Sequence, residues 1–353
     1  MATDPTRDLQ AEAAAAIPVT VLTGFLGSGK TTLLNGLLGH PGMAETAVLI
    51  NEFGEIGLDH LLVRKIDESV VLLNSGCLCC TIRGDLITAL RDLFLKRVRM
   101  EVPEFQRVVI ETTGLADPAP ILHTLMTDPL IGARYRLDGV VTTVDAVNGL
   151  SQLDTQAEPV KQAAVADRLV LTKLDLASPE AVAALTERLR RINPAAPLVS
   201  ADHGQIEPSV MLDCGLFNAR DKHPDVARWL GDEAIRAAAA HPHHAHDVNR
   251  HSEQISAFTL TFERPIPWSA LATALELLTA TRGENLLRLK GIVHTTESDQ
   301  PIVVHGVQHV FHPPVTLPDW PDTDHRTRLV FITRDLGRPA VESLIRAVVG
   351  EDA

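Results

Sequence analysis

The chain has 353 residues, of which 45% are hydrophobic and 22% are charged. This composition is ordinary for a globular protein and excludes a fibrous or largely disordered chain, and the length predicts two domains. The formal net charge of −13 disfavours nucleic acid and anionic membranes as partners. Residues 1–16 resemble a loose tail more than a secretory signal, and no apolar stretch reaches the roughly eighteen residues of a membrane span. We therefore expect a cytosolic protein.

Short apolar runs alternate with longer amphipathic stretches from residue 18 to about residue 200. The runs are VTVLT, AVLI, SVVLL, RVVIE, GVVTTVD, DRLVLT and APLVS, and helical stretches are expected at residues 30–38, 85–98 and 179–191. This rhythm is typical of β-α-β units around a buried parallel sheet. It predicts a doubly wound, mainly parallel α/β domain, whose ligands bind beyond the carboxyl ends of the strands.

The alternating pattern ends near residues 214–231, and residues 241–251 form a polar, histidine-rich stretch, HPHHAHDVNRH. We predict an N-terminal domain at residues 17–215, a linker at 216–253 and a smaller α+β domain at 254–353. In the last segment AFTLTFE, LLRLKGIVHT, QPIVVHGVQHV and RLVFIT have the pattern of strands, whereas PWSALATALELL and the final stretch have the pattern of helices.

A glycine-rich loop, Gly24 to Thr31, follows the first apolar run and opens a helical stretch. It matches the phosphate-binding pattern GxxxxGK[ST] in the strand, loop and helix context that this pattern requires. Backbone amides and the helix N-terminus would face the phosphates, Lys30 would reach the β- and γ-phosphates, and Thr31 would ligate Mg²⁺. An incidental glycine-rich turn is the alternative. The predicted contacts are Gly24, Gly27, Ser28, Gly29, Lys30, Thr31 and Thr32.

The run RVVIE ends in Glu111-Thr112-Thr113-Gly114. A strand end at this place would bring a carboxylate beside the Mg²⁺ and a glycine amide near the γ-phosphate. Glu111 and Gly114 are therefore predicted to act with Lys30 in catalysis, Glu111 by organising the water shell of the metal or the attacking water. The alternative is a surface glutamate that merely ends a strand. We expect Asp117 and the proline after it to shape the loop.

The nucleotide base is predicted from Lys173-Leu174-Asp175, which follows DRLVLT. The Asp175 carboxylate can accept the paired donors on the N1 and N2 edge of guanine, while the stem of Lys173 covers the ring. Adenine lacks this donor pair, so GTP and GDP are the predicted nucleotides. GTPases usually carry asparagine where this chain has Thr172, so one polar tie between the loop and the base is weakened or replaced.

Three cysteines stand together as Cys77, Cys79 and Cys80, also after an apolar run. Adjacent cysteines rarely form a disulfide, and three thiolates suit a borderline ion such as Zn²⁺. Cysteines packed in a core or acting as redox thiols are the alternatives. Glu55, in the loop after the second run, is a candidate oxygen ligand of this site. Glu52 in the same loop either faces the Mg²⁺ or is an ordinary solvated acid.

Two further groups of potential metal ligands stand apart from that cluster. Cys214 is isolated in the sequence, and a lone cysteine is most often a small core residue. The histidines of residues 241–251 have the composition of a low-affinity metal-binding tract. A solvated loop without function is the other interpretation of that stretch.

The motifs GFLGSGKTT, NEFGEIGLD, GCLCC, ETTGLADP and TKLD, in this order, resemble the CobW-type metal-handling P-loop GTPases. RLKGIV and the strand-rich tail resemble the C-terminal domain of that family. The resemblance implies GTP hydrolysis coupled to binding a transition metal, Zn²⁺ with cobalt or iron as alternatives, and to its delivery to an unidentified client metalloprotein. It also implies Cys79, Cys80 and Glu55 as metal ligands, with Cys77 as a neighbour that can join them.

The sequence thus predicts a metallochaperone GTPase with a P-loop NTPase fold, and it leaves two rival functions open. A P-loop small-molecule kinase would use ATP and would need a pocket for its acceptor. A nucleotide-regulated metal store would bind nucleotide without productive turnover. The sequence gives no indication of the oligomeric state.

Overall fold

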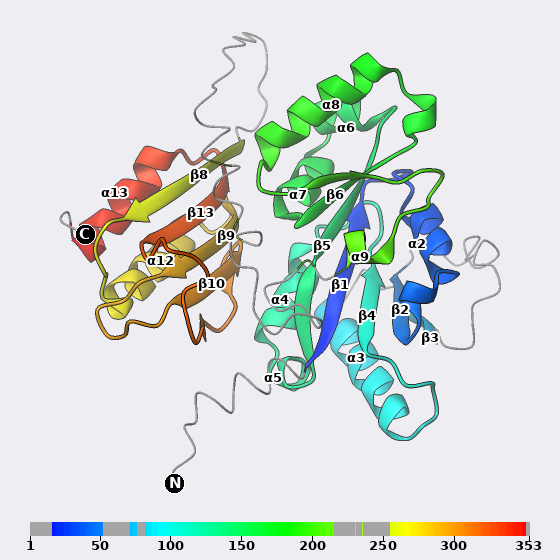
Figure 1. The fold of residues 1–353 in the computed structure, drawn as a ribbon, viewed down its shortest axis with the longest axis horizontal. Helices are drawn as coiled ribbons and strands as arrows, with labels where there is room; N and C mark the ends of the chain where they lie inside the picture. Colours follow the sequence, from blue (N-terminus) through cyan, green and yellow to red (C-terminus); the bar gives the residue numbers. More distant parts are fainter. Residues whose placement is uncertain are drawn as a thin grey trace. The chain divides into compact units, whose positions relative to one another are not determined.

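The structure, a computed structural model, describes residues 16–51, 71–75, 82–212, 214, 230, 235 and 255–350. The chain divides into two compact units, residues 1–186 with 197–223, and residues 187–196 with 224–353 (Figure 1). Each unit has its own sheet and its own hydrophobic core. In the described part of the chain, no helix combines the length and the apolar character needed to cross a membrane.

The first unit is built on a parallel sheet with the strand order β3-β2-β4-β1-β5-β6-β7. The strands are β1 (Ile17–Gly24), β2 (Thr46–Asn51), β3 (Val71–Ser75), β4 (Arg107–Glu111), β5 (Tyr135–Asp145), β6 (Arg168–Thr172) and β7 (Leu198–Ser200). The helices are α2 (Lys30–Leu38), α3 (Ile82–Val98), α4 (Ala119–Thr127), α5 (Pro129–Gly132), α6 (Gly149–Thr155), α7 (Ala157–Val165) and α9 (Pro208–Met211), and α8 (Pro179–Ile192) begins in this unit and ends in the second. The predicted doubly wound parallel fold is confirmed, with one strand for each of the seven apolar runs.

The sequences of the strands are continuous apolar runs because helices cover both faces of the sheet. On one face Leu22 and Val141 belong to the same core as Leu33 of α2. On the other face Val21 is fully buried, and α7 lies against β1 and β5. The isolated Cys214 is buried in the first of these cores, as predicted.

The second unit contains an antiparallel sheet with the order β11-β10-β9-β13-β8, in which β12 pairs with β10. The strands are β8 (Ile255–Phe262), β9 (Leu286–Val293), β10 (Ile302–Val307), β11 (Val310–Phe311), β12 (Val315–Thr316) and β13 (Thr327–Arg334), and the helices are α12 (Trp268–Arg282) and α13 (Arg338–Val349). Phe258 and Phe331 stack in the core with ring centroids 5.4 Å apart, beside Leu275 of α12 and Ile345 of α13. The α+β class predicted for this segment is confirmed.

The predicted strand QPIVVHGVQHV is two strands, which is a correction. Gln308 has a φ of 53°, a left-handed conformation that interrupts an extended strand. The chain therefore turns after β10 and returns as β11, with Gly306 opposite Phe311. The short strand β12 lies in a stretch for which the sequence predicted no element.

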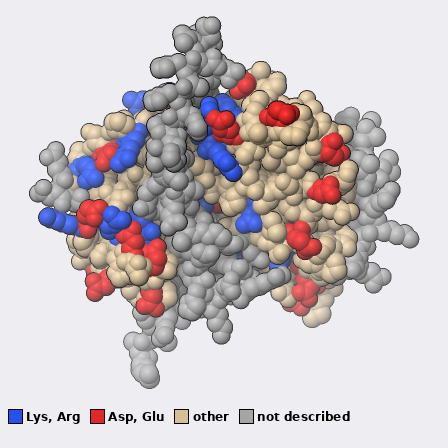
Figure 2. All heavy atoms as spheres, turned by 45° about the horizontal axis from the view of Figure 1, so that its top comes forward, with Lys and Arg blue, Asp and Glu red and all other residues tan. Residues whose placement is uncertain are grey.

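Charged side chains are interspersed on the surface. On the face drawn in Figure 2, acidic and basic side chains of the described residues stand among uncharged ones, and the basic ones form no continuous patch. The whole chain carries 45 acidic and 32 basic residues, so acids are in excess.

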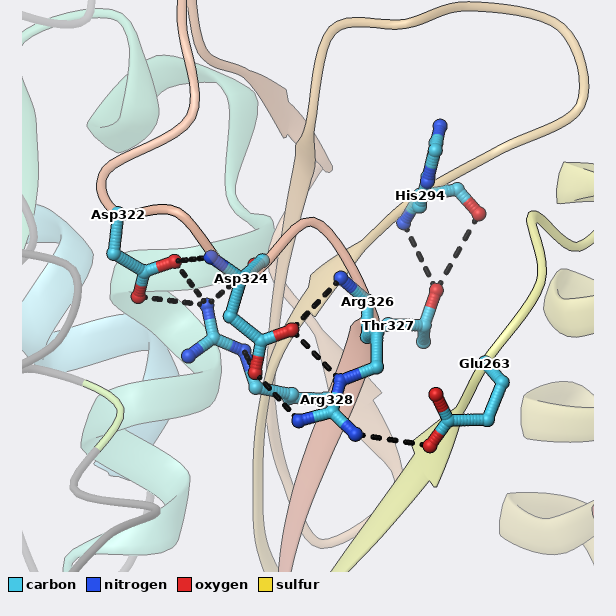
Figure 3. A network of polar contacts seen from close by, with 7 residues as sticks. All are labelled: Glu263, His294, Asp322, Asp324, Arg326, Thr327 and Arg328. Atoms are coloured by element: carbon cyan, nitrogen blue, oxygen red, sulfur yellow. Dashed lines mark hydrogen bonds and ion pairs between the residues drawn. The ribbon is translucent and has the colours of Figure 1, made fainter.

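An ion-pair network fixes the segment that leads into β13 (Figure 3). Arg326 donates through Nε to Asp324 at 2.8 Å and through Nη1 to Glu263 of the adjoining loop at 2.9 Å. These contacts lower the pKa of Asp324 to about 2 and raise the pKa of Arg326. The buried Arg328 donates to both carboxylate oxygens of Asp322. The network thus joins the end of β8 and the start of β13 to the loop that precedes β13.

The packing of α2 against the turn after β7 gives a prediction for two helical glycines. A Cβ on Gly36 of α2 would lie 2.2 Å from the carbonyl oxygen of Gly204, whereas a Cβ on Gly84 of α3 would meet nothing within 4 Å. We expect Gly36→Ala to lower the free energy of unfolding by about 1–3 kcal/mol through overpacking. Gly84→Ala should raise it by about 0.5–1 kcal/mol because alanine favours the helix. Urea denaturation measures both, and equal shifts would contradict the close approach.

Candidate nucleotide site

The loop between β1 and α2 has the backbone that the sequence predicted. Gly24, Gly27 and Gly29 have φ values of 145°, 71° and 89°, which side chains rarely allow. A Cβ on Gly24 would also lie 2.2 Å from Oγ1 of Thr143. Glycine is therefore required for this conformation of the loop. α2 begins at Lys30, so its N-terminal amides and the positive end of its dipole lie at the loop, where an anion is favoured.

Lys30 is buried and folds back over this loop. Its ammonium donates to the carbonyl oxygens of Gly24 at 2.8 Å and Phe25 at 3.2 Å. A carbonyl oxygen stabilises a buried cation less than an anionic acceptor does. The charge of Lys30 is thus placed where it would move to phosphate oxygens when an anionic ligand enters.

The end of β4 meets the start of α2 through a hydrogen bond between side chains. Thr31 donates from its hydroxyl to Oε1 of Glu111 at 2.9 Å, and Glu111 is only 4% exposed. The interpretation of Glu111 as a surface glutamate is therefore wrong. A hydroxyl and a carboxylate side by side are the hard oxygen donors that Mg²⁺ prefers, and Mg²⁺ keeps several waters besides. The residues present fit a nucleotide-bound Mg²⁺, which Thr31 would ligate and around which Glu111 would order water.

The loop after Glu111 is held between the glycine-rich loop and α7. A Cβ on Gly114 would lie 2.7 Å from the backbone nitrogen of Leu26, so only glycine permits this approach. From the other side, Nε2 of Gln162 donates to the carbonyl oxygens of Gly114 at 3.2 Å and Ala116 at 3.0 Å. Asp117 accepts from the amide of Ala119 at 2.9 Å, which agrees with its predicted role in shaping the loop. A displacement of this loop would therefore alter its contacts with both the glycine-rich loop and α7.

Thr172, which stands where GTPases usually carry asparagine, forms hydrogen bonds that connect the glycine-rich loop to the end of β6. Its hydroxyl lies 2.8 Å from the carbonyl oxygen of Ser28 in the glycine-rich loop and 3.3 Å from that of Val144. The hydroxyl of Ser28 in turn shares a hydrogen bond of 2.7 Å with Thr143. The departure from asparagine thus leaves the loop connected to the end of β6.

Lys173 is anchored by Asp145, the last residue of β5. Lys173 has a φ of 55°, and its Nζ donates to Oδ2 of Asp145 at 2.7 Å. Oδ1 of Asp145 accepts from the amides of Val147 and Asn148 at 2.8 and 3.2 Å. Burial, the largest influence, raises the pKa of Asp145, but its hydrogen bonds to Lys173, Asn148 and the backbone together bring the pKa below its ordinary value. The stem of Lys173 is thereby held in one direction.

Asp175 lies on the open side of the same strand end. It belongs to a short 3₁₀ helix, Leu174–Leu176, and its side chain is 39% exposed. Nδ1 of His203 lies 3.7 Å from Oδ2 of Asp175. The carboxylate is thus accessible to a ligand, as recognition of a base requires.

The sequence analysis missed Gln162, Asp145 and His203. Gln162 lies on α7, a helix for which no bounds were predicted, and Asp145 and His203 are ordinary polar residues at strand ends. No sequence pattern marks them, because their contacts join residues 28 to 48 positions apart. Their positions depend on the order of strands in the sheet.

The predicted transition-metal ligands Cys77, Cys79, Cys80 and Glu55 lie outside the described residues, as does Glu52. The histidine-rich stretch 241–251 lies outside them too. Within residues that the structure describes, no three His, Cys, Asp or Glu side chains are grouped so that they could hold a metal ion.

The sheet and the glycine-rich loop define a P-loop nucleotide-binding protein. Residues 18–200 match the family described as "CobW/HypB/UreG, nucleotide-binding domain", and residues 255–349 match the "Cobalamin synthesis protein cobW C-terminal domain". The chain belongs to the CobW family. The predicted resemblance is therefore confirmed.

Two relatives match the chain over most of its length. The chain is 34% identical over 316 residues to the zinc chaperone YjiA of Escherichia coli (strain K12). The aligned region covers 90% of this chain and 93% of that protein. It is 30% identical over 325 residues to the zinc-regulated GTPase metalloprotein activator 1 of Schizosaccharomyces pombe, covering 84% and 76%. The crystal structure of Zn(II)-bound YjiA GTPase from E. coli superimposes with a TM-score of 0.67 and 28% identity, covering 94% of this chain and 99% of that one.

The ion pair of Asp145 gives a prediction about pH. Its folded-state pKa lies below its value in the unfolded chain, about 3.9. The contribution to stability is therefore complete above that value and is lost as the pH falls through the folded-state pKa. At about pH 6 we expect the free energy of unfolding of Asp145→Asn to be about 1–3 kcal/mol lower than that of wild type, since a charge-assisted hydrogen bond is lost. By about pH 3 the difference should shrink in urea denaturation. A difference independent of pH would contradict this account.

Proposed function

We propose that the chain is a GTPase that binds a transition metal, with Zn²⁺ as the proposed ion, and couples its nucleotide state to delivery of that metal to a client metalloprotein. The names of two relatives support this proposal: zinc chaperone, and zinc-regulated GTPase metalloprotein activator. The cytosolic location predicted from the sequence belongs to the same proposal. The client remains to be identified, and its chemistry is that of a protein that needs a bound metal.

One observation carries the hydrolytic part of the proposal. The hydroxyl of Thr31 and the buried carboxylate of Glu111 are hydrogen-bonded at 2.9 Å beside the glycine-rich loop. Phosphoryl transfer depends on positioning and on neutralising charge at the phosphates. In the proposed site Lys30 binds the β- and γ-phosphates, Thr31 ligates Mg²⁺, Glu111 orients water, and the amide of Gly114 lies near the γ-phosphate.

The base is assigned to guanine through Lys173 and Asp175. The stem of Lys173 is held by Asp145, and the Asp175 carboxylate is partly exposed at the same strand end. A carboxylate accepts both donors of the guanine N1 and N2 edge, whereas adenine presents an acceptor at N1. The remaining proposed contacts come from the glycine-rich loop and the start of α2: Gly24, Gly27, Ser28, Gly29 and Thr32.

The proposed metal site combines Cys77, Cys79 and Cys80 with Glu55, and the metal is cargo rather than a resident cofactor. A thiolate-rich set suits Zn²⁺. Among the similar structures is a Zn(II)-bound triple mutant of YjiA GTPase with one glutamate and two cysteines replaced by alanine, superimposing with a TM-score of 0.68. Because that mutant is zinc-bound without those three side chains, zinc binding alone does not identify which residues are the ligands. A test on this chain must therefore use binding that changes with the nucleotide.

Removing the charge of Lys30 tests hydrolysis. We expect Lys30→Ala to abolish multiple-turnover release of phosphate from GTP, because the β- and γ-phosphates lose their cation. Lys96→Ala, in the last turn of α3, removes an equal charge and serves as the matched control. Wild-type turnover should itself be slow, well below about one per second, as for unaided GTPases.

Three outcomes of this phosphate-release assay separate the rival functions. Turnover in Lys30→Ala equal to wild type would contradict the catalytic assignment. No multiple turnover in wild type would favour a metal store that binds nucleotide without hydrolysing it. Turnover of ATP in preference to GTP, dependent on an added acceptor, would favour a small-molecule kinase.

The coupling between nucleotide and metal is tested by zinc affinity. We expect Zn²⁺ to bind more tightly with a non-hydrolysable GTP analogue than with GDP, because an ordered loop brings Glu55 to the thiolates before the metal arrives. Couplings of this kind typically amount to about 5- to 150-fold, and Zn²⁺ must change the preference for GTP over GDP by the same factor. Chelator competition measures the affinities.

The double mutant Cys79→Ser, Cys80→Ser is the control for the coupling experiment. It should lose the nucleotide-dependent part of zinc binding while its GDP affinity stays unchanged. Equal zinc affinities in the two nucleotide states of wild type would contradict the coupling. Unchanged coupling in the double mutant would move the site elsewhere, with the histidines of residues 241–251 as the next candidates.

A further inference from the structure

A tight turn follows β7 and carries His203. The amide of Asp202 donates to the carbonyl of Gln205 at 3.0 Å, and the amide of Gln205 donates back to Asp202 at 2.7 Å. His203 and Gly204, between them, have φ values of 48° and 78°. Two consecutive positive φ values closed by such a pair of hydrogen bonds define a two-residue turn of the I′ kind. The direction of the His203 side chain is therefore set by a rigid backbone.

The turn is fixed to the elements that bind phosphate and base. The carbonyl of Gly204 packs against Gly36 of α2, where a Cβ would lie 2.2 Å away. A Cβ on Gly204 would lie 2.9 Å from Cγ2 of Thr32, at the start of the same helix. The amide of Ala201 donates to Leu171 of β6 at 2.9 Å, four residues before Asp175. The turn thus keeps a constant position relative to Asp175.

The imidazole of His203 lies between two carboxylates. Nδ1 is 3.7 Å from Oδ2 of Asp175, and Nε2 is 3.6 Å from Oδ1 of Asp202. The His203 side chain is 70% exposed, so no packing against a core accounts for its place. Only polar contacts and the turn determine it.

We propose that His203 is a specificity-determining residue that orients the Asp175 carboxylate for guanine. Paired acceptance of the N1 and N2 donors requires the plane of the carboxylate to lie along the edge of the base. A single donor contact tolerates other orientations. The imidazole of His203, whose Nδ1 lies 3.7 Å from Oδ2, occupies one side of the Asp175 carboxylate, restricts its rotation and leaves the remaining lone pairs for the base. His203 thus acts through Asp175.

This inference rests on the proposed guanine site, and its test separates the two. Inosine diphosphate differs from GDP only by the missing 2-amino group, so the ratio of their dissociation constants measures the paired contact. ADP reports on the choice of guanine itself. Isothermal titration calorimetry of the full chain with Mg²⁺ and each of the three diphosphates supplies the constants.

The variants are chosen for the positive φ of His203. His203→Gly removes the imidazole without strain in the turn. His203→Asn tolerates a positive φ and places an amide donor near the former Nδ1 position. His309→Gly removes another exposed imidazole, from the turn between β10 and β11, and is the matched control.

In wild type we expect GDP to bind about tenfold or more tightly than inosine diphosphate, as for a hydrogen bond to a charged group. In His203→Gly this ratio should fall about 3- to 10-fold, with little change for inosine diphosphate. His203→Asn should restore part of the ratio, and His309→Gly should leave it unchanged. An unchanged ratio in His203→Gly, or an equal loss for both nucleotides, would overturn the role of His203 and leave the guanine site standing. Equal binding of ADP and GDP by wild type would overturn the guanine site itself.

Discussion

Ser28 ties the glycine-rich loop to two neighbouring strand ends at once. Its hydroxyl bonds the hydroxyl of Thr143 on β5 at 2.7 Å, and its carbonyl lies 2.8 Å from the hydroxyl of Thr172 on β6. Ser28 is 1% exposed, so both bonds form away from water, where a lost partner leaves an unsatisfied group. The loop that would hold phosphate is therefore directly connected to the strand end that would hold the base. The remaining contacts of the site are built around this connection.

Lys30 and the Gly114 loop have contacts that a bound ligand would change. Lys30 is bound to two carbonyl oxygens of its own loop, and an entering anion would exchange those acceptors for charged ones. Gly114 touches the backbone of Leu26 and is held from behind by Gln162. A ligand that displaces the Gly114 loop must therefore break or shift the bonds to α7. Coupling from the nucleotide to more distant residues would travel through a packed, bistable element of this kind.

The sequence predicted those elements correctly whose formation depends on the local pattern of hydrophobic residues. The parallel strands are buried on both faces, so each appears as an apolar run, and the helix at residues 30–38 was predicted with its observed bounds. Errors arose where backbone conformation or tertiary contact decides. The left-handed Gln308 divides one predicted strand into two, and a change of φ leaves no mark on hydrophobic patterning. The contacts of Asp145, Gln162 and His203 depend on which strand ends become neighbours in the sheet.

The replacement of asparagine by Thr172 separates two tasks that one motif usually combines. The threonine hydroxyl reaches Ser28, so the connection between the loop and β6 is kept. A hydroxyl is shorter than an amide and carries a single donor, which the bond to the Ser28 carbonyl engages. In the proposed guanine site, discrimination of the base would then depend on Asp175 and on the groups that fix its carboxylate. Asp145 fixes Lys173 on one side of that strand end, and the turn of His203 stands on the other. In the proposed site, selection of guanine would therefore depend on three strand ends rather than on one motif.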